Sequence, residues 1–424
     1  MSKTEIIPPS GVYWPLGKKE AFYTLVIVIL VNAIDHIDRL ILTSLFPYLK
    51  DAFQLTDSQL GLLSSVTSFS IAILALFAGY FVDNWSRKKT LAIILIIWSF
   101  ASGWTAVATT FLGLLIARIF IGIGEAGYNP ASQSLIAASF PLKYRTTALA
   151  CIGLGAMLGS SLGLLLGAII AKNFGWHSAL GIMAIPGFIL ALLAMFIKDF
   201  KNNSDDQNIT KKTSMLGMIR SFKYRPSLVI VFFAQSSIYL FTFTLSVWMI
   251  VYMTRIAHHS LVVASSINAG FLLFSACCAL CGGILNDWLR SRSIIFAIKY
   301  DIYACIVAFI IVFIAIKFVS PGSILQVVLI FMHCIFIVPL YSMNYALTAD
   351  LTEYNERGTA GSLLIMTQNL LGIGLGPLLG GIFSDCFGIG NSLAIMSVFL
   401  LISGGCYIYI SIRFDKDIKN IKSN

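Results

Sequence analysis

Charged residues are scarce in this sequence. Asp, Glu, Lys and Arg together account for 11% of its 424 residues, while 58% are hydrophobic. A soluble protein of this length would carry about 25% charged residues. The shortage of charge and the mean hydropathy of +0.87 exclude an ordinary soluble domain. They indicate a protein that crosses a membrane several times.

Sequence patterns of enzyme chemistry are also missing. The chain has no cluster of metal ligands, no glycine-rich phosphate loop followed by lysine and no nucleophile of the GxSxG type. We therefore expect no metal, no cofactor and no enzyme activity. The longest polar segment, 199–226, is too short for a soluble signalling domain, so a non-transporting membrane sensor is a remote alternative.

Long apolar runs fill the chain instead. Twelve of them are long enough to cross roughly 30 Å of hydrocarbon. They lie near 22–46, 59–82, 89–108, 111–139, 145–171, 178–198, 227–254, 261–288, 292–318, 323–351, 358–385 and 390–413. We predict an all-α membrane protein with twelve transmembrane helices.

The basic residues predict the orientation of these helices. If the N-terminus is cytoplasmic, the inner loops and tails hold 22 of the 29 Lys and Arg residues. Cytoplasmic loops are normally enriched in basic residues, so we expect both termini in the cytoplasm, in a plasma membrane or bacterial inner membrane. The net charge of +10 is spread over these short loops, which argues against a nucleic-acid partner.

The chain also divides into two similar halves. The predicted domains are a six-helix bundle at 1–198, a cytoplasmic loop at 199–226 and a second bundle at 227–424. A motif after the second run recurs after the eighth, and we predict that both copies form gating loops. Its members are Gly79, Asp83, Arg87 and Lys88 in the first half and Gly283, Asp287 and Arg290 in the second. Two six-helix repeats are typical of secondary transporters.

Glycines in the fifth run support this organisation. Gly155, Gly159, Gly163 and Gly167 recur every four residues, a spacing that lets helices approach closely. The eleventh run is glycine-rich as well, so we expect these two helices to form the surfaces across which the halves rock. Static close packing is the competing interpretation.

Several segments of the first half resemble a known family. These are Asp38-Arg39, Trp98-Ser99 and the stretch RIFIGIGEAGYNPASQSLIAASFPLKYRTTAL from Arg118 to Leu149. In them the chain resembles the major facilitator superfamily and, within it, the spinster family. Similar patterns occur in the anion:cation symporters of the superfamily.

The resemblance implies a function and a set of residues. Spinster proteins are secondary transporters, several of them for lysophospholipids or sphingosine phosphate, and a monomer is the default state of the superfamily. It implies that Asp38, Arg39 and Glu125 serve proton coupling and conformational switching, and that Arg118 belongs to the same motif. Asp35 departs from the family, which usually has asparagine there.

Helical spacing leads to a similar cluster. Asp35, Asp38 and Arg39 stand at i, i+3 and i+4 and share one face, while Arg118 and Glu125 are two turns apart. A charge at membrane depth costs roughly 2.5 kcal/mol or more unless it is paired, so we expect Arg39 to contact these acids. Loss of that contact in a dry cavity would favour protonation of a carboxylate. A purely structural ion-pair network is the alternative.

Other polar residues in the spans are weaker candidates. In this superfamily the corresponding helices line the cavity, which makes these residues candidates for substrate binding or switching; each is equally compatible with a packed, hydrogen-bonded side chain. They are Asn32, Tyr128, Gln235, Tyr239, Trp248 and Asn344. Lys299 and Asp301 fall in a helix that is peripheral in such folds, where we expect both to snorkel toward the membrane surface.

The sequence thus predicts a proton-coupled secondary transporter that works by alternating access. Its partners would be protons, membrane lipids and an amphipathic or anionic organic solute, such as a lysophospholipid or sphingolipid. A proton-coupled symporter of small organic anions or nutrients on the same fold is the main alternative. Arg39 and Arg118 suit an anionic group under either hypothesis.

Overall fold

The computed structural model describes residues 14–15, 17–84, 86–198, 224–353 and 356–422. Within these residues the secondary structure is helical and no strand occurs. Ten helical segments are long and apolar enough to cross a membrane, and α1 and α3, of 27 and 28 residues, run beside them. The predicted all-α membrane fold is confirmed.

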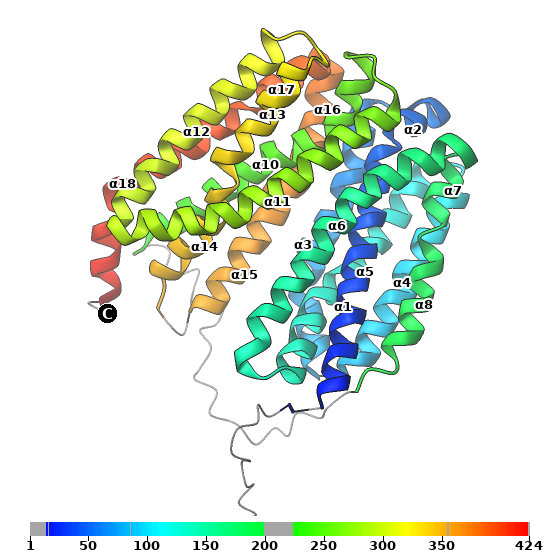
Figure 1. Cartoon of the computed structure of the whole chain (residues 1–424), viewed down its shortest axis with the longest axis horizontal. Helices are drawn as coiled ribbons and strands as arrows, with labels where there is room; N and C mark the ends of the chain where they lie inside the picture. The colour runs from blue at the N-terminus through cyan, green and yellow to red at the C-terminus, as the bar shows by residue number, and fades with distance from the viewer. Residues whose placement is uncertain (1–13, 16, 85, 199–223, 354–355, 423–424) are drawn as a thin grey trace, which may run out of the picture.

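The first bundle contains the helices up to residue 194 (Figure 1). They are α1 (Lys18–Ser44), α2 (Phe46–Phe53), α3 (Asp57–Asn84), α4 (Arg87–Val107), α5 (Phe111–Ser139), α6 (Leu142–Phe174), α7 (Trp176–Gly181) and α8 (Ala184–Ala194). Six of the predicted apolar runs correspond to these helices, with α7 and α8 together forming the sixth.

The second bundle contains the remaining helices. They are α10 (Pro226–Arg255), α11 (Leu261–Arg292), α12 (Ile294–Lys317), α13 (Ile324–Ile337), α14 (Pro339–Asp350), α15 (Arg357–Thr367), the π-helix η1 (Gln368–Gly374), α16 (Leu375–Phe387), α17 (Ile389–Met396) and α18 (Val398–Lys422). The tenth span breaks between α13 and α14 at Pro339, which has no backbone N–H to continue the helix. The eleventh is interrupted by η1, and π-helical turns are frequent at functional sites.

Two predictions concern segments that the structure does not fully describe. The linker 199–226 lies almost entirely outside the described residues, so the division into three domains stays a prediction. Gly79 and Asp83 belong to α3 and Arg87 begins α4, but their side chains also lie outside the described part. The first copy of the predicted gating motif is therefore described only at Lys88, which is half-buried.

The glycines of α6 do not face the opposite bundle. A Cβ atom on Gly159 would lie 2.2 Å from the carbonyl oxygen of Ala33, and one on Gly163 would lie 2.6 Å from that of Ile37. Both carbonyls belong to α1, so this stripe lets two helices of the same bundle pack backbone to backbone. The static interpretation holds for α6. Its contact with the second bundle includes Ser161, whose hydroxyl donates to Ala269 at 3.4 Å.

The two bundles meet firmly at one end, here called the Asp57 end (Figure 1). Arg255, from the last turn of α10, donates to both carboxylate oxygens of Asp57 at 2.7 and 2.9 Å. In return, Asp385 of α16 accepts the backbone N–H groups of Asp57 and Ser58, each at 2.8 Å. We call these reciprocal contacts the Asp57–Asp385 clamp. The bundles separate toward the opposite end, where α1 begins, here called the Lys18 end.

Candidate coupling site

A buried ion pair joins α1 to α5. The Nη2 atom of Arg39 donates to the Oε2 atom of Glu125. The Glu125 side chain is 6% exposed and that of Arg39 is 23% exposed. The predicted contact between these two residues is therefore present, and it joins the last third of α1 to the middle of α5. Because the Nε atom of Arg39 has no hydrogen-bond partner in the described structure, this arginine retains capacity to bind another group.

Asp35 lies beside this pair. It lines the same small cavity as Glu125, and its carboxyl group lies 3.3 Å from the Nδ1 atom of His36. One of the two oxygens of Glu125, Oε1, is buried and has no hydrogen-bond partner among the described residues, so it is free to take a proton. Asp35, Glu125 and Arg39 thus form a cluster with one positive charge and two neighbouring acids.

Asp38 has a different partner from the one that sequence spacing predicts. It points away from Arg39 and lies 3.7 Å from the Nη1 atom of Arg118. The hydroxyl of Ser102 donates to it at 2.8 Å, and the indole N–H of Trp98 at 3.4 Å. Asp38 is fully buried and Arg118 is 1% exposed. Consecutive residues on a helix point about 100° apart, which is why Asp38 and Arg39 enter separate pairs.

The cavity beside the cluster is very small. It has a volume of about 10 Å³, which is space for about one water molecule. Its walls are formed by Val31, Asp35, Ile94, Leu95, Trp98, Gly124, Glu125 and Tyr128. The two acids therefore face a space that suits a proton or a water molecule and is too small for an organic solute in this conformation.

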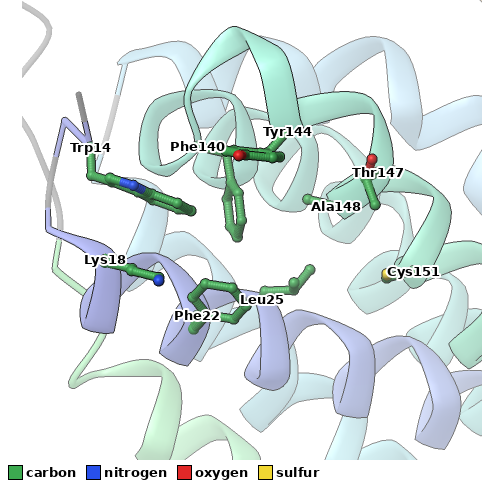
Figure 2. A pocket seen from close by; sticks show the side chains of 9 residues that line it. All are labelled: Trp14, Lys18, Phe22, Leu25, Phe140, Tyr144, Thr147, Ala148 and Cys151. Carbon is green, nitrogen blue, oxygen red and sulfur yellow. The ribbon is translucent and has the colours of Figure 1, made fainter. Parts of the chain in front are cut away.

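A larger pocket lies at the Lys18 end, away from the charged cluster (Figure 2). It has a volume of about 470 Å³ and is formed by α1, the end of α5 and the start of α6. Figure 2 shows aromatic rings on its walls and the Lys18 amine on one side. The residues lining it are Trp14, Lys18, Phe22, Leu25, Phe140, Tyr144, Thr147, Ala148 and Cys151.

Two of the first-half candidates are engaged in packing. The Tyr128 hydroxyl donates to the carbonyl of Val28 at 2.8 Å, which ties α5 to α1. The Asn32 side chain donates to the carbonyl of Ile152 at 2.8 Å, which ties α1 to α6. Both groups already have partners inside the bundle, so the packing interpretation describes them in this conformation.

Two of the second-half candidates, Gln235 and Asn344, belong to a buried chain of hydrogen bonds. Tyr407 donates to Asn344 at 2.9 Å, Asn344 donates to Gln235 at 2.7 Å, and Gln235 donates to Gln368 at 3.1 Å. Sequence reasoning missed Gln368 and Tyr407. A lone glutamine inside the glycine-rich eleventh run was the available signal for Gln368.

The remaining candidates occupy packed or peripheral positions. Trp248 donates to the carbonyl of Pro377 at 3.0 Å and packs against Phe46 of the first bundle. Tyr239 stacks on Tyr341. The second copy of the predicted gating motif lies within helix α11 and not in a loop, and its Asp287 is exposed.

The prediction that Asp301 snorkels is wrong. Lys299 is exposed as expected, but Asp301 is fully buried. It lies on the face of α12 that packs against α18, which sequence alone could not distinguish from the lipid-facing side. Arg290, the arginine of the second predicted gating motif, lies in α11 and pairs with Asp350 of α14 at 2.7 Å.

Comparison with known proteins places this architecture in a family. The sequence pattern of the Major Facilitator Superfamily matches residues 28–300. The chain belongs to this superfamily. It is accordingly an integral membrane transporter and not an enzyme, and the predicted resemblance is confirmed.

Relatives of two kinds match the chain. It is 25% identical to protein spinster homolog 1 of Xenopus laevis, covering 95% of this chain and 83% of that protein. It is also 25% identical to the hexuronate transporter of Bacillus subtilis, covering 95% of this chain and 96% of that protein. The sphingosine-1-phosphate transporter SPNS2 of Mus musculus is 28% identical, over 85% of this chain and 69% of that protein.

Solved structures agree with the fold. A bacterial homolog to the human lysosomal transporter spinster, in an inward-facing and unoccupied conformation, matches with a TM-score of 0.85 at 19% identity. That match covers 95% of this chain and 99% of the other. A D-xylose-proton symporter matches with a TM-score of 0.73 at 16% identity, covering 94% and 99%.

Proposed function

We propose that this transporter is proton-coupled and moves an anionic organic solute by alternating access. The observation that carries the proposal is the cluster of Arg39, Glu125 and Asp35. One arginine neutralises a buried glutamate, and a second carboxyl group lines the same small cavity. The position of the Arg39 charge and the protonation of Glu125 are therefore linked, which is the requirement for proton coupling.

The coupling step follows from the charges. While Arg39 is bound to Glu125, the guanidinium stabilises the glutamate as a carboxylate. If Arg39 turns to an anionic solute, Glu125 loses its counter-ion in a dry site and takes up a proton from the cavity beside it. When solute and proton leave together, Arg39 pairs again with the Glu125 carboxylate and the cluster returns to its starting charge.

Arg118 and Asp38 would serve switching rather than solute contact. They are buried together with Ser102 and Trp98 at the junction of α1, α4 and α5. Breaking such a pair by removing one partner costs roughly 3–5 kcal/mol. The pair would therefore keep the three helices moving as one body.

The solute is proposed to be an anion, since both kinds of relative are named for anions. Sphingosine-1-phosphate is an amphipathic phosphate and a hexuronate is a small sugar acid. The spinster relatives favour a lysophospholipid or sphingolipid, and the hexuronate transporter, matched over 96% of its length, favours a small organic acid as the second candidate.

Uptake competition tests the proposal. Proteoliposomes with an imposed pH gradient would be given a labelled lysophospholipid or a labelled hexuronate, each with the other as unlabelled competitor. We expect uptake of one of them that collapses when a protonophore removes the gradient. Uptake that ignores the gradient would contradict proton coupling, and uptake of neither anion would contradict the proposed solute class.

The proposal also includes location and assembly. Both termini would lie in the cytoplasm of a plasma membrane or bacterial inner membrane, and the protein would act as a monomer. The Asp57 end would then be the outer end, and the conformation described above would be closed to the outside.

A further inference from the structure

Asp301 is a buried acid to which the coupling mechanism assigns no role. It lies on α12 with no exposed surface. Neither of its carboxyl oxygens has a hydrogen-bond partner among the residues that the structure describes. An ionised carboxylate in such a place is strongly disfavoured, because nothing replaces the water it has lost.

The groups around Asp301 do not supply a compensating charge. The one positive charge that acts on it within the described part of the chain is Arg290 of α11. That guanidinium is already bound to Asp350 at 2.7 Å.

The other titratable neighbours are neutral. Cys305 and Tyr300 on α12, and Tyr407 and Cys406 on α18, carry no positive charge near neutral pH. On α13, His333 stacks against Phe271 of α11, and α17 has no charged residue.

A chain of hydrogen bonds runs from the helix beside this acid toward the first bundle. It begins at the hydroxyl of Tyr407 on α18, the helix on which α12 packs, and continues through Asn344 and Gln235 to Gln368. Gln368 is the first residue of η1, and η1 packs on α3 of the first bundle: a Cβ atom on Gly374 would lie 2.4 Å from the ring of Phe69. A change of charge at Asp301 can thus alter the packing of η1 on α3, an interface between the bundles that must move during transport.

We propose that Asp301 is a second proton-binding site, located in the second bundle. In this conformation it holds one proton as a neutral carboxylic acid. The proton leaves to water, and the carboxylate stays behind, when Arg290 exchanges Asp350 for Asp301. The two bundles would then each contain an acid and an arginine that can change partners. The link to transport rests on the proposed function, whereas the bound proton does not.

Infrared difference spectroscopy of the full-length protein in lipid nanodiscs tests the bound proton directly. At neutral pH, the wild-type spectrum minus that of Asp301→Asn should contain the carbonyl stretch of one protonated carboxylic acid. The matched control is Asp417→Asn, because Asp417 is equally buried but accepts the backbone N–H of Ser227 at 2.9 Å. Its difference spectrum should contain the bands of an ionised carboxylate.

Three further outcomes decide the remaining questions. If Asp301→Asn does not fold, Asp301→Glu should retain the protonated band at a shifted frequency. Carboxylate bands in place of the protonated band at neutral pH would overturn the proposal. A protonated band that disappears when sodium replaces choline would overturn it as well, since the site would then bind a metal cation.

Transport measurements separate this inference from the proposed function. In proteoliposomes, Asp301→Asn should move fewer protons per solute than the wild type, measured with a pH-sensitive dye. A proton stoichiometry equal to that of the wild type would contradict the link to transport. A clear infrared band in a protein whose uptake ignores the pH gradient would leave Asp301 as a proton site and refute proton-coupled transport.

Discussion

The two arginines of the coupling site differ in what they can reach. The side chain of Arg39 is 23% exposed, whereas that of Arg118 is 1% exposed and held beside Asp38. A residue that exchanges partners needs a path to a new one, and only Arg39 has such a path in this conformation. The sequence suggests that both arginines suit an anionic group, so their difference in burial is new information from the structure.

At the residue scale, the proposed coupling makes Glu125→Gln informative. Glutamine retains the shape of the side chain and cannot gain or lose a proton at neutral pH. We expect accumulation driven by a pH gradient to fall at least tenfold, while solute exchange without a gradient continues. Parallel gradient-driven uptake and counterflow assays in proteoliposomes measure this difference.

The control for this prediction is Tyr23→Phe. It removes a hydroxyl of α1 that donates to the backbone of Leu193 in α8 at 2.8 Å, away from the cavity beside Glu125. It should leave the pH dependence of uptake unchanged. Gradient-driven accumulation that survives in Glu125→Gln would reduce the pair with Arg39 to a structural contact between α1 and α5.

At the scale of elements, the Asp57–Asp385 clamp should hold the Asp57 end closed. Burial alone would raise the pKa of Asp57, but hydrogen bonds from Arg255, Lys50 and Ser384 lower it to about 2. The clamp stabilises the closed state fully above the ordinary pKa of about 3.9. That stabilisation is lost as the pH falls toward 2, so it is constant at physiological pH.

An asparagine at position 57 should therefore behave at every pH as a protonated Asp57 would, and weaken the clamp. We expect Asp57→Asn to shift the population toward a state that is open at the Asp57 end, seen as longer distances between spin labels on the two bundles. Asp51→Asn, at an exposed acid of α2, serves as the control. Identical distance distributions in wild type and Asp57→Asn would show that the clamp does not set this equilibrium.

The contact between α6 and α1 predicts a second effect at this scale. Gly159→Ala would place a methyl group 2.2 Å from the carbonyl of Ala33. We expect it to destabilise the protein by about 1–3 kcal/mol, the usual range for overpacking. Gly153→Ala is the matched control on the same helix, because nothing lies within 4 Å of its Cβ position. Thermal unfolding in detergent should separate the two, and equal melting temperatures would contradict the close approach.

At the scale of the whole molecule, the proposed orientation can be checked with exposed lysines. Lys172 and Lys317 lie near the Asp57 end, whereas Lys143 and Lys416 lie near the Lys18 end. In intact cells, a membrane-impermeant amine reagent followed by mass spectrometry should label the first pair and spare the second. Labelling of the second pair alone would place the termini outside the cytoplasm.

The fold could be predicted well from the sequence because each membrane-spanning helix requires a long apolar run, which hydropathy identifies directly. The twelve apolar runs correspond to the helices, and the contact between Arg39 and Glu125 was anticipated from their depth and the family pattern. What sequence could not supply was the rotation of each helix about its axis. That rotation decides that Asp38 meets Arg118, that Asp301 faces inward and that the glycines of α6 face α1. The clamp was missed because its partners are 328 residues apart.

The clamp also completes the cap of α3, in which Thr56 and Gln59 bind each other's backbone N–H groups but leave those of Asp57 and Ser58 without a partner in their own bundle. The first N–H groups of any α-helix need an acceptor, and two of those in α3 find it in Asp385, a residue of the other bundle. When the bundles part, these groups pass from a carboxylate to water. Loss of a helix cap costs about 0.5–2 kcal/mol, while 1.4 kcal/mol changes an equilibrium about tenfold. Helix capping across the two bundles would thus act as a weak latch, which binding of one solute or one proton has enough energy to release.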